Sequence, residues 1–498
     1  MPLFRKLLIA NRGEIAVRVA RTCRAMGIPT VAVYSEVDRD ALHVREADEA
    51  VAIGAAEAAR SYLDIERVVG AARQTGAEAV HPGYGFLSEN GDFAEAVARA
   101  GLVFVGPPAP VHRRMGDKQA ARRLMAGAGV PVVPGYDGDD QSEAALLAAG
   151  ERIGWPVLVK PARGGGGKGM RVVRGAGDLA SALAASRREA RAAFGDDRVV
   201  LERCVERPRH VEVQVLGDAQ GALVHLLERE CSIQRRHQKI VEETPSPALD
   251  QRLRARVCAA GVAAARAAGY VNAGTVEFLL APSGEFYFLE MNTRLQVEHP
   301  VTEAVTGLDL VRLQVEVAAG APLPFTQDVV AARGHALECR IYAEDPARDD
   351  RPSPGRVLHL SVPAGPGVRF DSGVEAGSEV TVHYDPLLAK LITWGASRAE
   401  SIERMAAALA RTVVLGITTN HGRLRAIVDH PAFRGGDLHT GFVDEHLAGA
   451  PPDPCPPAEA VAAAVAALHR ARPAPEGRPP GAADPWSSVG AWRLGAPS

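Results

Sequence analysis

A predicted β-hairpin that sets two glutamates opposite each other constrains this chain more than any other stretch. Its strands, residues 275–280 and 285–292, are rich in β-branched and aromatic residues, and Ala-Pro-Ser-Gly at 281–284 is typical of a turn. A loop of two or four residues centred on this turn places Glu277 directly opposite Glu290. Like charges that face each other across strands destabilise a sheet, and buried carboxylates need a partner. The hairpin therefore predicts either a bound cation or a separate Arg or Lys partner for each glutamate.

Oxygen-bearing side chains continue on the same side of the second strand. Asn292 lies two residues beyond Glu290, so the two side chains share a face. Two carboxylates and an amide oxygen suit a hard cation, Mg²⁺ or Mn²⁺, whose coordination is completed by substrate oxygens. Arg294, Gln296 and Glu298 continue the alternation, and in an extended chain they line up beside the metal. A guanidinium there fits a planar oxyanion, and a carboxylate can take a proton.

Composition predicts a globular, soluble protein of the cytoplasm. The 498 residues have room for about two to four domains, and a net charge of −3 gives no bulk basic character that would favour nucleic acid. The six cysteines lie far apart and form no C-x-x-C, which fits reduced thiols rather than a zinc cluster. The apolar run at the N-terminus is too short for a signal peptide, and no stretch is long enough to span a membrane.

The first 115 residues predict a parallel sheet with helices between its strands. Residues 5–35 are a strand–turn–helix–strand unit. Further strands are expected at 50–54, 78–85 and 102–107. This is a Rossmann-like pattern, but Asn-Arg-Gly-Glu at 11–14 is not the G-x-G-x-x-G fingerprint, so no dinucleotide site is expected. His81 follows a strand, and we expect a packed loop histidine rather than a catalytic one.

A glycine-rich loop predicts phosphate binding. Residues 155–173 read as strand, loop and strand, with four successive glycines at 164–167 whose bare amides can fold over phosphates. Lys160 ends the first strand. The loop is not a Walker A motif, because Lys168 is followed by Gly169, and the alternative is a flexible linker. With a strand at 199–206 beside which a nucleotide base can lie, residues 130–205 predict a small α/β lid.

The segments on either side of the lid supply further charged candidates. A helix begins near residue 115 with Lys118 in its first turn, and a solvated lysine is the alternative there. Residues 209–245 predict two strands around a turn at 217–221, and then a charged segment that contains His237 and Lys239. Helices are expected at 250–270, 303–320, 397–412 and 420–430, and strands at 380–395.

Residues 334–345 predict a strand that carries Arg340. Glu338 and Glu344 flank this arginine, so a structural ion pair is an alternative to a functional role. The ordered unit is expected to end near residue 447. Beyond it, Pro-rich and Ala-rich stretches predict a linker with a helix at 458–471.

Five motifs together resemble the biotin carboxylase family. They are MGDK (115–118), GGGGKGM (164–170), HVEVQVLGD (210–218), ERECSIQRRHQK (228–239) and EMNTRLQVEHPVTE (290–303). The resemblance covers about residues 3–447, and the absence of an internal repeat disfavours the duplicated carbamoyl-phosphate synthetase large subunit. It implies an α/β and α+β fold in four parts: a Rossmann-like N-domain (1–115), an ATP-grasp core with a mobile lid (116–330), a C-terminal mixed α/β subdomain (331–447), and a linker with a possible docking region (448–498).

The resemblance implies an ATP-dependent ligase that carboxylates biotin with bicarbonate, through carboxyphosphate. It implies that the nucleotide is contacted by Lys118, Lys160, Gly166, Gly167, Glu202, Val205, His210, Gln234 and His237. It implies that two Mg²⁺ or Mn²⁺ ions are held by Glu277, Glu290 and Asn292. It implies that bicarbonate is bound by Lys239, Arg294, Gln296 and Val297. Glu298 is then the general base, Arg340 helps to bind bicarbonate and the biotin enolate, and Arg294 stabilises that enolate.

The sequence departs from the family pattern in one place and leaves two other functions open. Pro-Ala-Arg at 161–163 stands before the glycines, where the family usually has small residues. The chain has no Met-Lys-Met motif, so we expect biotin on a carrier protein or carrier domain. Residues 484–494 resemble the entry to the docking domain of acyl-CoA carboxylase α subunits, which implies a truncated α subunit with a carboxyltransferase partner, in a homodimer or larger complex. The alternatives are another ATP-grasp ligase and a non-catalytic, nucleotide-binding regulatory subunit.

Overall fold

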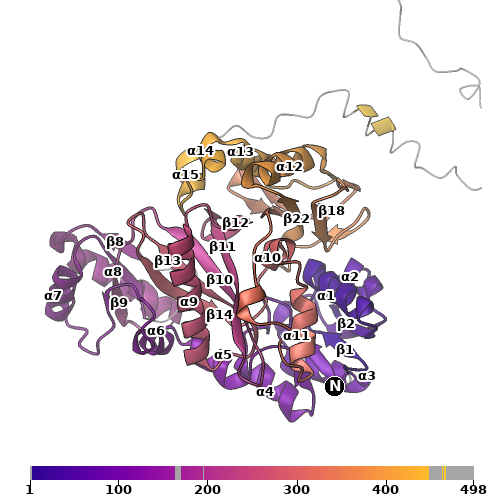
Figure 1. The fold of residues 1–498 in the computed structure, drawn as a ribbon, viewed down its shortest axis with the longest axis horizontal. Helices are drawn as coiled ribbons and strands as arrows, with labels where there is room; N and C mark the ends of the chain where they lie inside the picture. Colours follow the sequence, from indigo (N-terminus) through magenta and orange to yellow (C-terminus); the bar gives the residue numbers. More distant parts are fainter. Residues whose placement is uncertain (1–2, 163–169, 195, 448–461, 464, 467–498) are drawn as a thin grey trace, which may run out of the picture. The chain divides into compact units, whose positions relative to one another are not determined.

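The computed structural model describes residues 3–162, 170–194, 196–447, 462–463 and 465–466 (Figure 1). Contacts divide the chain into two units, Met1–Ala450 and Pro451–Ser498. In the second unit, 462–463 and 465–466 are helical, and the rest of the helix predicted at 458–471 lies outside the described residues. Predictions for Arg163, Gly166, Gly167 and Lys168, and for residues 484–494, also lie outside them. No helix among the described residues is long and apolar enough to cross a membrane.

A five-stranded parallel sheet begins the first unit. Its order is β3-β2-β1-β4-β5, with strands Glu49–Gly54, Thr30–Ser35, Leu7–Ile9, Ala79–His81 and Val103–Phe104. Helices between them are α1 (Gly13–Ala25), α2 (Leu42–Glu46), α3 (Ile65–Thr75) and α4 (Gly91–Arg99). The strand order grows outward from β1 in both directions, which confirms the predicted Rossmann-like arrangement. His81 belongs to β4 itself rather than to a loop, and it is fully buried.

A separate four-stranded sheet corresponds to the predicted lid. Its order is β6-β9-β7-β8, with strands Gly135–Tyr136, Val199–Arg203, Val157–Pro161 and Arg171–Val173. Helices α7 (Glu143–Ile153) and α8 (Ala176–Phe194) pack on it, at the left of Figure 1. Leu146, Val159 and Leu201 belong to an apolar core of its own. This small core explains how the sheet forms a distinct body beside the larger one.

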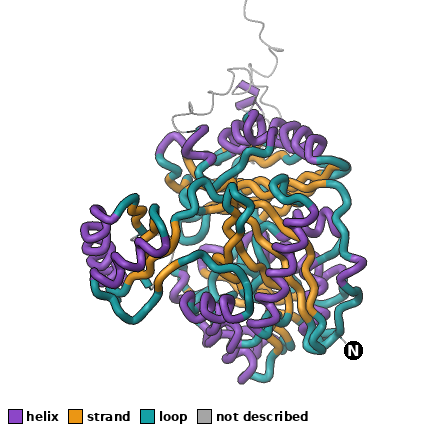
Figure 2. The backbone as a smooth tube through the Cα atoms, turned by 60° about the vertical axis from the view of Figure 1, so that its left-hand side comes forward, coloured by secondary structure: helices purple, strands orange, loops and turns teal. Residues whose placement is uncertain are grey.

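The largest sheet has eight strands in the order β14-β13-β10-β11-β12-β15-β22-β20. In that order they span Phe286–Asn292, Asn272–Leu280, Arg209–Gly217, Leu223–Arg235, Gln238–Thr244, His335–Tyr342, Leu387–Gly395 and Val368–Ser372, and all neighbours are antiparallel. Helix α9 (Gln251–Ala268) packs on β10, β11 and β13, and α10 (His299–Thr306) packs on β15 and β22. Figure 2 shows these strands running between helices.

The remaining elements connect and cover these sheets. The helices are α5 (Ala109–Gly116), α6 (Lys118–Gly127), α11 (Leu310–Ala318), α12 (Arg398–Arg411), α13 (His421–Asp429), α14 (Pro431–Gly435) and α15 (Phe442–His446). The short strands are β16 (Glu344–Asp345), β17 (Arg351–Pro352), β18 (Gly355–Arg356), β19 (His359–Ser361), β21 (Glu379–Val380) and β23 (Val413–Leu415). One helix predicted at 303–320 is two, because Gly307 ends α10 in the left-handed region and Asp309 caps α11.

The hairpin pairs Glu277 with Glu290, as predicted, but through a different loop. The loop has five residues, 281–285, and near it Phe278 pairs with Phe288. A register shift between Glu277 and Phe278 places an extra residue, Leu289, in β14 and so brings the two glutamates opposite each other. The predicted loop of two or four residues was wrong, and a β-bulge compensates for the difference.

The charged segment after the second predicted strand is itself part of the sheet. Residues up to Arg235 complete β11, Arg236 and His237 form the turn with positive φ, and β12 follows at Gln238. The sequence predicted a charged segment here without assigning it to strands, and the structure places most of it in β11 and β12, where partners neutralise its charges. Arg235, for example, lies 2.8 Å from Glu344.

We predict that Phe278→Ala lowers the free energy of unfolding by about 3–5 kcal/mol, because it leaves a cavity in the core beneath the hairpin. Phe278 is fully buried and packs edge-on against Phe286 and Phe288. Its neighbour Leu279 faces the cavity side of the same strand, so Leu279→Ala is the matched control and should cost clearly less. Denaturant titration of both variants measures this, and equal losses would contradict the assignment of the two faces.

Candidate functional site

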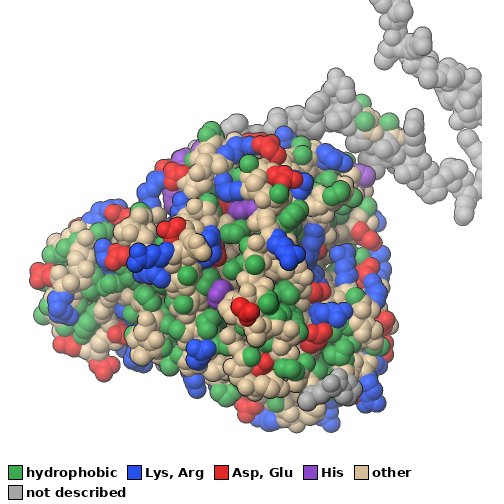
Figure 3. Space-filling view, viewed as in Figure 1, with side chains coloured by type: hydrophobic (Ala, Val, Ile, Leu, Met, Phe, Trp, Pro, Cys, Tyr) green, Lys and Arg blue, Asp and Glu red, His purple; other side chains and the backbone are tan. Residues whose placement is uncertain are grey.

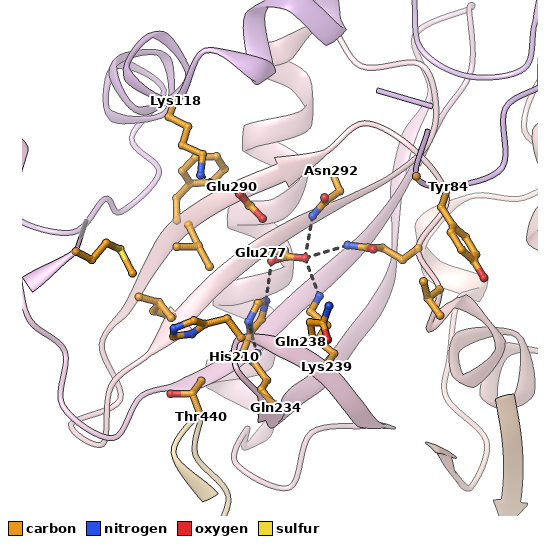
Figure 4. Close-up of a pocket in the computed structure, with 18 of the residues that line it drawn as sticks. Tyr84, Lys118, His210, Gln234, Gln238, Lys239, Glu277, Glu290, Asn292 and Thr440 are labelled. Atoms are coloured by element: carbon orange, nitrogen blue, oxygen red, sulfur yellow. Dashed lines mark hydrogen bonds and ion pairs between the residues drawn. The ribbon is translucent and has the colours of Figure 1, made fainter. Parts of the chain in front are cut away.

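A cavity of about 870 Å³ opens between the lid sheet, the eight-stranded sheet and loops of the parallel-sheet region. Every described residue that the family resemblance assigned to the site lines it, apart from Glu298, which lies directly behind the wall. These lining residues are Lys118, Lys160, Glu202, Val205, His210, Gln234, His237, Lys239, Glu277, Glu290, Asn292, Arg294, Gln296, Val297 and Arg340. They come from separate parts of the chain, and the fold brings them to one place (Figure 4).

One ammonium group, that of Lys239 on β12, joins three carboxylates. Its Nζ lies 2.5 Å from Glu212 Oε2, 2.7 Å from Glu277 Oε1 and 2.9 Å from Glu298 Oε1. Burial alone would raise the pKa of Glu277 and Glu298, but the charge of Lys239 overcomes it and holds both pKa values below the ordinary range. The same three carboxylates raise the pKa of Lys239 against its own burial. Glu277 and Glu298 are therefore ionised at neutral pH, whereas burial raises the pKa of Glu212.

Glu277 is the most heavily contacted carboxylate of the cavity. Besides Lys239, it pairs with His210 Nε2 at 2.8 Å and accepts hydrogen bonds from Asn292 Nδ2 at 2.8 Å and Gln296 Nε2 at 2.9 Å. Figure 4 shows it at the centre of these contacts. The alternative of a lysine partner for each glutamate is thus partly realised, since Glu277 has one.

Glu290 differs from Glu277 in having almost no compensation. Its side chain is 42% exposed to the cavity, and Lys118 Nζ stays 3.7 Å from Glu290 Oε2. Burial first, and then the charge of Glu277, raise the pKa of Glu290. A carboxylate that faces a cavity beside a second carboxylate fits a divalent cation. Asn292 fits less directly, because its Nδ2 is turned to Glu277 and its Oδ1 accepts from Arg294 at 3.0 Å.

The segment after β14 that carries Arg294, Gln296 and Glu298 does not stay extended as expected. Arg294 donates to Gln296 Oε1 at 2.8 Å and lies 3.3 Å from Glu89 Oε2. The chain then turns at Val297 and Glu298 to enter α10. This turn directs Glu298 behind the wall, where it reaches Lys239 and Arg340. The three side chains gather as predicted, although by a turn rather than by strand alternation.

Arg340 on β15 has different partners from those its sequence neighbours suggested. Its Nη2 lies 2.6 Å from Glu242 Oε1 and 2.9 Å from Glu298 Oε2. Glu344 pairs with Arg235 instead. Arg340 therefore connects the wall of the cavity to a second buried carboxylate that the motifs did not indicate.

The other end of the cavity combines cations with apolar walls. Lys160 on β7 pairs with Glu202 on β9, which also lies 3.8 Å from Arg122. His210 and Gln234 are joined at 2.9 Å, and Lys118 keeps 59% of its side chain exposed. Apolar lining comes from Leu158, Val200, Leu279 and Phe288. This combination suits a flat heterocycle linked to phosphates. On the face drawn in Figure 3, basic and acidic side chains are interspersed.

Sequence reasoning missed several buried charged residues that build the site. They are Glu14, Glu212, Arg229, Glu242 and Lys390, while Glu338 was considered only as an ion-pair partner of Arg340. Arg229 is fully buried and lies 2.5 Å from Glu212, which links it to Lys239. The sequence does contain a signal for such residues, which is a charged residue inside an otherwise apolar strand. Glu212 in His-Val-Glu-Val-Gln-Val-Leu at 210–216 is an example, and a charge in such a place needs a buried partner.

Three protein-family models match the chain in succession. They are "Biotin carboxylase, N-terminal domain" at residues 3–111, "Carbamoyl-phosphate synthase L chain, ATP binding domain" at 117–326, and "Biotin carboxylase C-terminal domain" at 338–445. The matched ranges follow the parallel sheet, the lid with most of the eight-stranded sheet, and the final strands and helices.

Curated proteins and solved structures give the same family. The chain is 52% identical to a biotin carboxylase of Nostoc, over 89% of this chain and 99% of that protein. It is 49% identical to a mitochondrial methylcrotonoyl-CoA carboxylase α subunit of Arabidopsis thaliana, over 94% of this chain but only 64% of that subunit. The biotin carboxylase domain dimer of Hydrogenobacter thermophilus 2-oxoglutarate carboxylase, solved with MgADP, ADP and bicarbonate, is similar at a TM-score of 0.84 and 43% identity, over 90% of this chain and 98% of that one.

We predict that Lys239→Met lowers the free energy of unfolding by about 3–5 kcal/mol at neutral pH, because it leaves buried carboxylates uncompensated. The pKa values of Glu277 and Glu298 are lowered in the folded chain, so the stability they contribute is present above their unfolded pKa and is lost as the pH falls. The difference in free energy of unfolding between the variant and the unmodified chain should therefore become smaller as the pH falls.

Denaturant titrations across acid and neutral pH measure this difference. Lys6→Met is the matched control, since Lys6 pairs with the half-exposed Glu49 and should cost less than about 1 kcal/mol. A deficit for Lys239→Met that is independent of pH would contradict its role as the shared counter-charge.

Proposed function

Because this chain belongs to the biotin carboxylase family, we propose that it uses ATP and bicarbonate to carboxylate biotin held on a carrier protein or domain. The observation that carries the proposal is the position of Lys239. It contacts Glu277, beside the open carboxylate Glu290, and also Glu298, beside Arg340. One cavity thus joins a place for a metal-bound nucleotide to a place for a small oxyanion and a base. Residues 1–115, 116–330 and 331–447 are the proposed domains, which the matched family ranges support.

The nucleotide is assigned to the end of the cavity beneath the lid. Lys118 and Lys160 contact its phosphates, and the contacts expected of Gly166 and Gly167 lie outside the described residues. Glu202 and Val205 border the base, and His210, Gln234 and His237 line the rest of the pocket. The relative solved with MgADP supports this ligand class. Glu277 and Glu290, with Asn292 after its amide turns, would hold two Mg²⁺ or Mn²⁺ ions, which supply charge neutralisation on the phosphates.

Bicarbonate is assigned to the opposite side of Lys239. Lys239, Arg294, Gln296 and the backbone of Val297 surround that position, and Glu298 takes the bicarbonate proton. The lowered pKa of Glu298 keeps it ionised and ready to accept, but it makes the carboxylate a weak base. Proton transfer is therefore concerted with attack of the bicarbonate oxygen on the γ-phosphorus, which yields ADP and carboxyphosphate.

The second step uses the products of the first. Carboxyphosphate breaks its carbon–oxygen bond to give CO₂ and phosphate, inside a site from which the lid excludes water. Phosphate then takes the proton from N1′ of biotin, and the resulting enolate attacks CO₂. Arg294 stabilises the enolate oxygen as a fixed positive charge, and Arg340 helps to bind both bicarbonate and the enolate.

The proposal extends to partners and location. We infer a biotin carrier protein or domain, a carboxyltransferase subunit and a homodimer or larger complex. Support comes from the carboxylase subunits among the relatives and from the domain dimer among the solved structures. We place the chain in the cytoplasm, since all cysteines in the described part of the chain are free.

We predict that the purified chain releases ADP from Mg·ATP in a reaction that requires bicarbonate and accelerates with free biotin. A coupled assay for ADP measures the rate with each component omitted in turn. Release that ignores biotin would point to another acceptor, and release without bicarbonate would contradict the proposed first step.

The Arg294→Ala variant tests in the same assay whether Arg294 stabilises the biotin enolate. Loss of the enolate contact should lower biotin carboxylation by about 10²–10³-fold while the fold is retained, as judged by circular dichroism. A turnover close to that of the unmodified chain would remove Arg294 from the mechanism.

A further inference from the structure

Two fully buried carboxylates face each other behind the wall of the cavity that Arg340 lines. Glu242 on β12 pairs with Glu338 on β15 across the antiparallel ladder. Arg340 lies two residues beyond Glu338 on the same strand and so shares its face. Lys390 on β22 lies opposite Arg340 in the strand ladder and shares that face too. This face packs against α10, where Val301 and Val305 contact Ala336 and Ile392. The pair is thus enclosed between the sheet and α10, whose N-cap residue is Glu298.

The two carboxylates have little to compensate them. Glu242 is 1% exposed and Glu338 is 0% exposed. Within the described residues, neither oxygen of Glu338 accepts a hydrogen bond, and Glu242 has only its ion pair with Arg340. An ionised carboxylate in such a place is costly, and two like charges at opposed strand positions repel each other. Two carboxyl groups that share a site ionise one at a time.

Positive charge around the pair is already engaged elsewhere. Lys390 donates to Val297 O at 2.8 Å and lies 3.1 Å from Glu14. Lys239 holds the three carboxylates of the cavity. The titratable and charged groups that act on the pair are Arg340, Cys339 and Tyr342 on β15, Lys239 on β12, Cys231 on β11, Lys390 on β22 and Glu298 before α10. Lys390 in turn interacts with Glu14 on α1 and His299 on α10.

A bulge in β12 explains how one strand contributes Lys239 to the cavity and Glu242 to the buried carboxylate pair. The register shift between Ile233 and Gln234 means that two residues of β12 oppose one of β11, so Lys239 and Glu242 point to the same side although they are three residues apart. Lys239 then reaches one oxygen of Glu298, and Arg340, held by Glu242, reaches the other.

We propose that, above neutral pH, Glu242 and Glu338 share a single proton and act as a positioning pair that holds Arg340 against Glu298. Glu338 carries the proton and Glu242 carries the charge. Burial raises the pKa of Glu338 well above the ordinary range, and it raises that of Glu242 to about 7. The inference deepens the proposed function, on whose assignment of Glu298 as base it rests.

The pair has a definite effect on the proposed chemistry. Arg340 Nη2 stands between Glu242 and Glu298, so it is paired on both sides while Glu298 is ionised. When Glu298 takes a proton from bicarbonate, Glu242 still holds the guanidinium in place for the later enolate. As the pH falls through about 7, Glu242 is protonated and this hold is lost.

The first test needs no enzymatic activity. The infrared carbonyl absorption of protonated carboxyl groups is recorded on the full chain above neutral pH, and Glu338→Gln should remove the intensity of one buried group. An unchanged spectrum in this variant would overturn the proposal whether or not the chain carboxylates biotin. Should Glu338→Gln fail to fold, Glu338→Met serves instead. Replacing a neutral, unpaired acid by an apolar side chain should leave the melting temperature nearly unchanged, and a large fall would show an ionised Glu338.

The second test separates positioning from structure. Glu242→Gln should lower kcat roughly tenfold, leave the KM for ATP unchanged, and abolish the fall of kcat on the acid side of pH 7. Glu243→Gln is the control, because Glu243 is equally buried but pairs with His335 and Arg398 on the other side of the sheet. Equal losses of kcat in both variants, or an unchanged acid limb in Glu242→Gln, would contradict the role of the pair.

Discussion

The contact on which the rest of the site depends is the ammonium of Lys239 held among Glu212, Glu277 and Glu298. Three carboxylates that are buried to this degree repel one another, and a single lysine cannot neutralise them. The balance comes from Arg229 beside Glu212 and Arg340 beside Glu298. Charges of alternating sign therefore run through the eight-stranded sheet, and removing any one leaves its neighbours uncompensated.

This arrangement explains why the site is built on strands rather than loops. Strands β10, β11, β12 and β13 are adjacent in the sheet, and each contributes one or more of these charges from a fixed ladder position. Their opposite faces contribute apolar side chains to the core beneath α9, including Val211, Val213 and Phe278. The packing that fixes the core thereby fixes the distances between charged groups, which is what an electrostatically preorganised site needs.

The sequence predicts the parallel sheet, the lid strands and the pairing of Glu277 with Glu290, because periodicity and turn residues are local signals. It does not predict the bulge at Leu289 or the tight turn between β11 and β12, because Arg236 and His237, which form that turn with positive φ, are not typical turn residues, and nothing in 285–292 marks one residue as extra. The hairpin pattern predicts Glu277, Glu290, Asn292, Arg294, Gln296 and Glu298 as site residues, and the family resemblance supplies the roles of the others. Neither predicts that Glu242 and Glu338 form a pair, because β12 and β15 are far apart in the sequence and neither strand alone indicates its partner.

The central claim is that bicarbonate, activated at Glu298, attacks the γ-phosphorus of ATP. The most direct measurement follows the oxygen atoms: the reaction is run with ¹⁸O-labelled bicarbonate, and the phosphate produced is examined by mass spectrometry. Formation of carboxyphosphate, followed by cleavage of its carbon–oxygen bond, leaves one bicarbonate oxygen on each phosphate. Phosphate that carries no label from bicarbonate would show that water attacks phosphorus, and the proposed roles of Glu298, Lys239 and Arg340 would then be wrong.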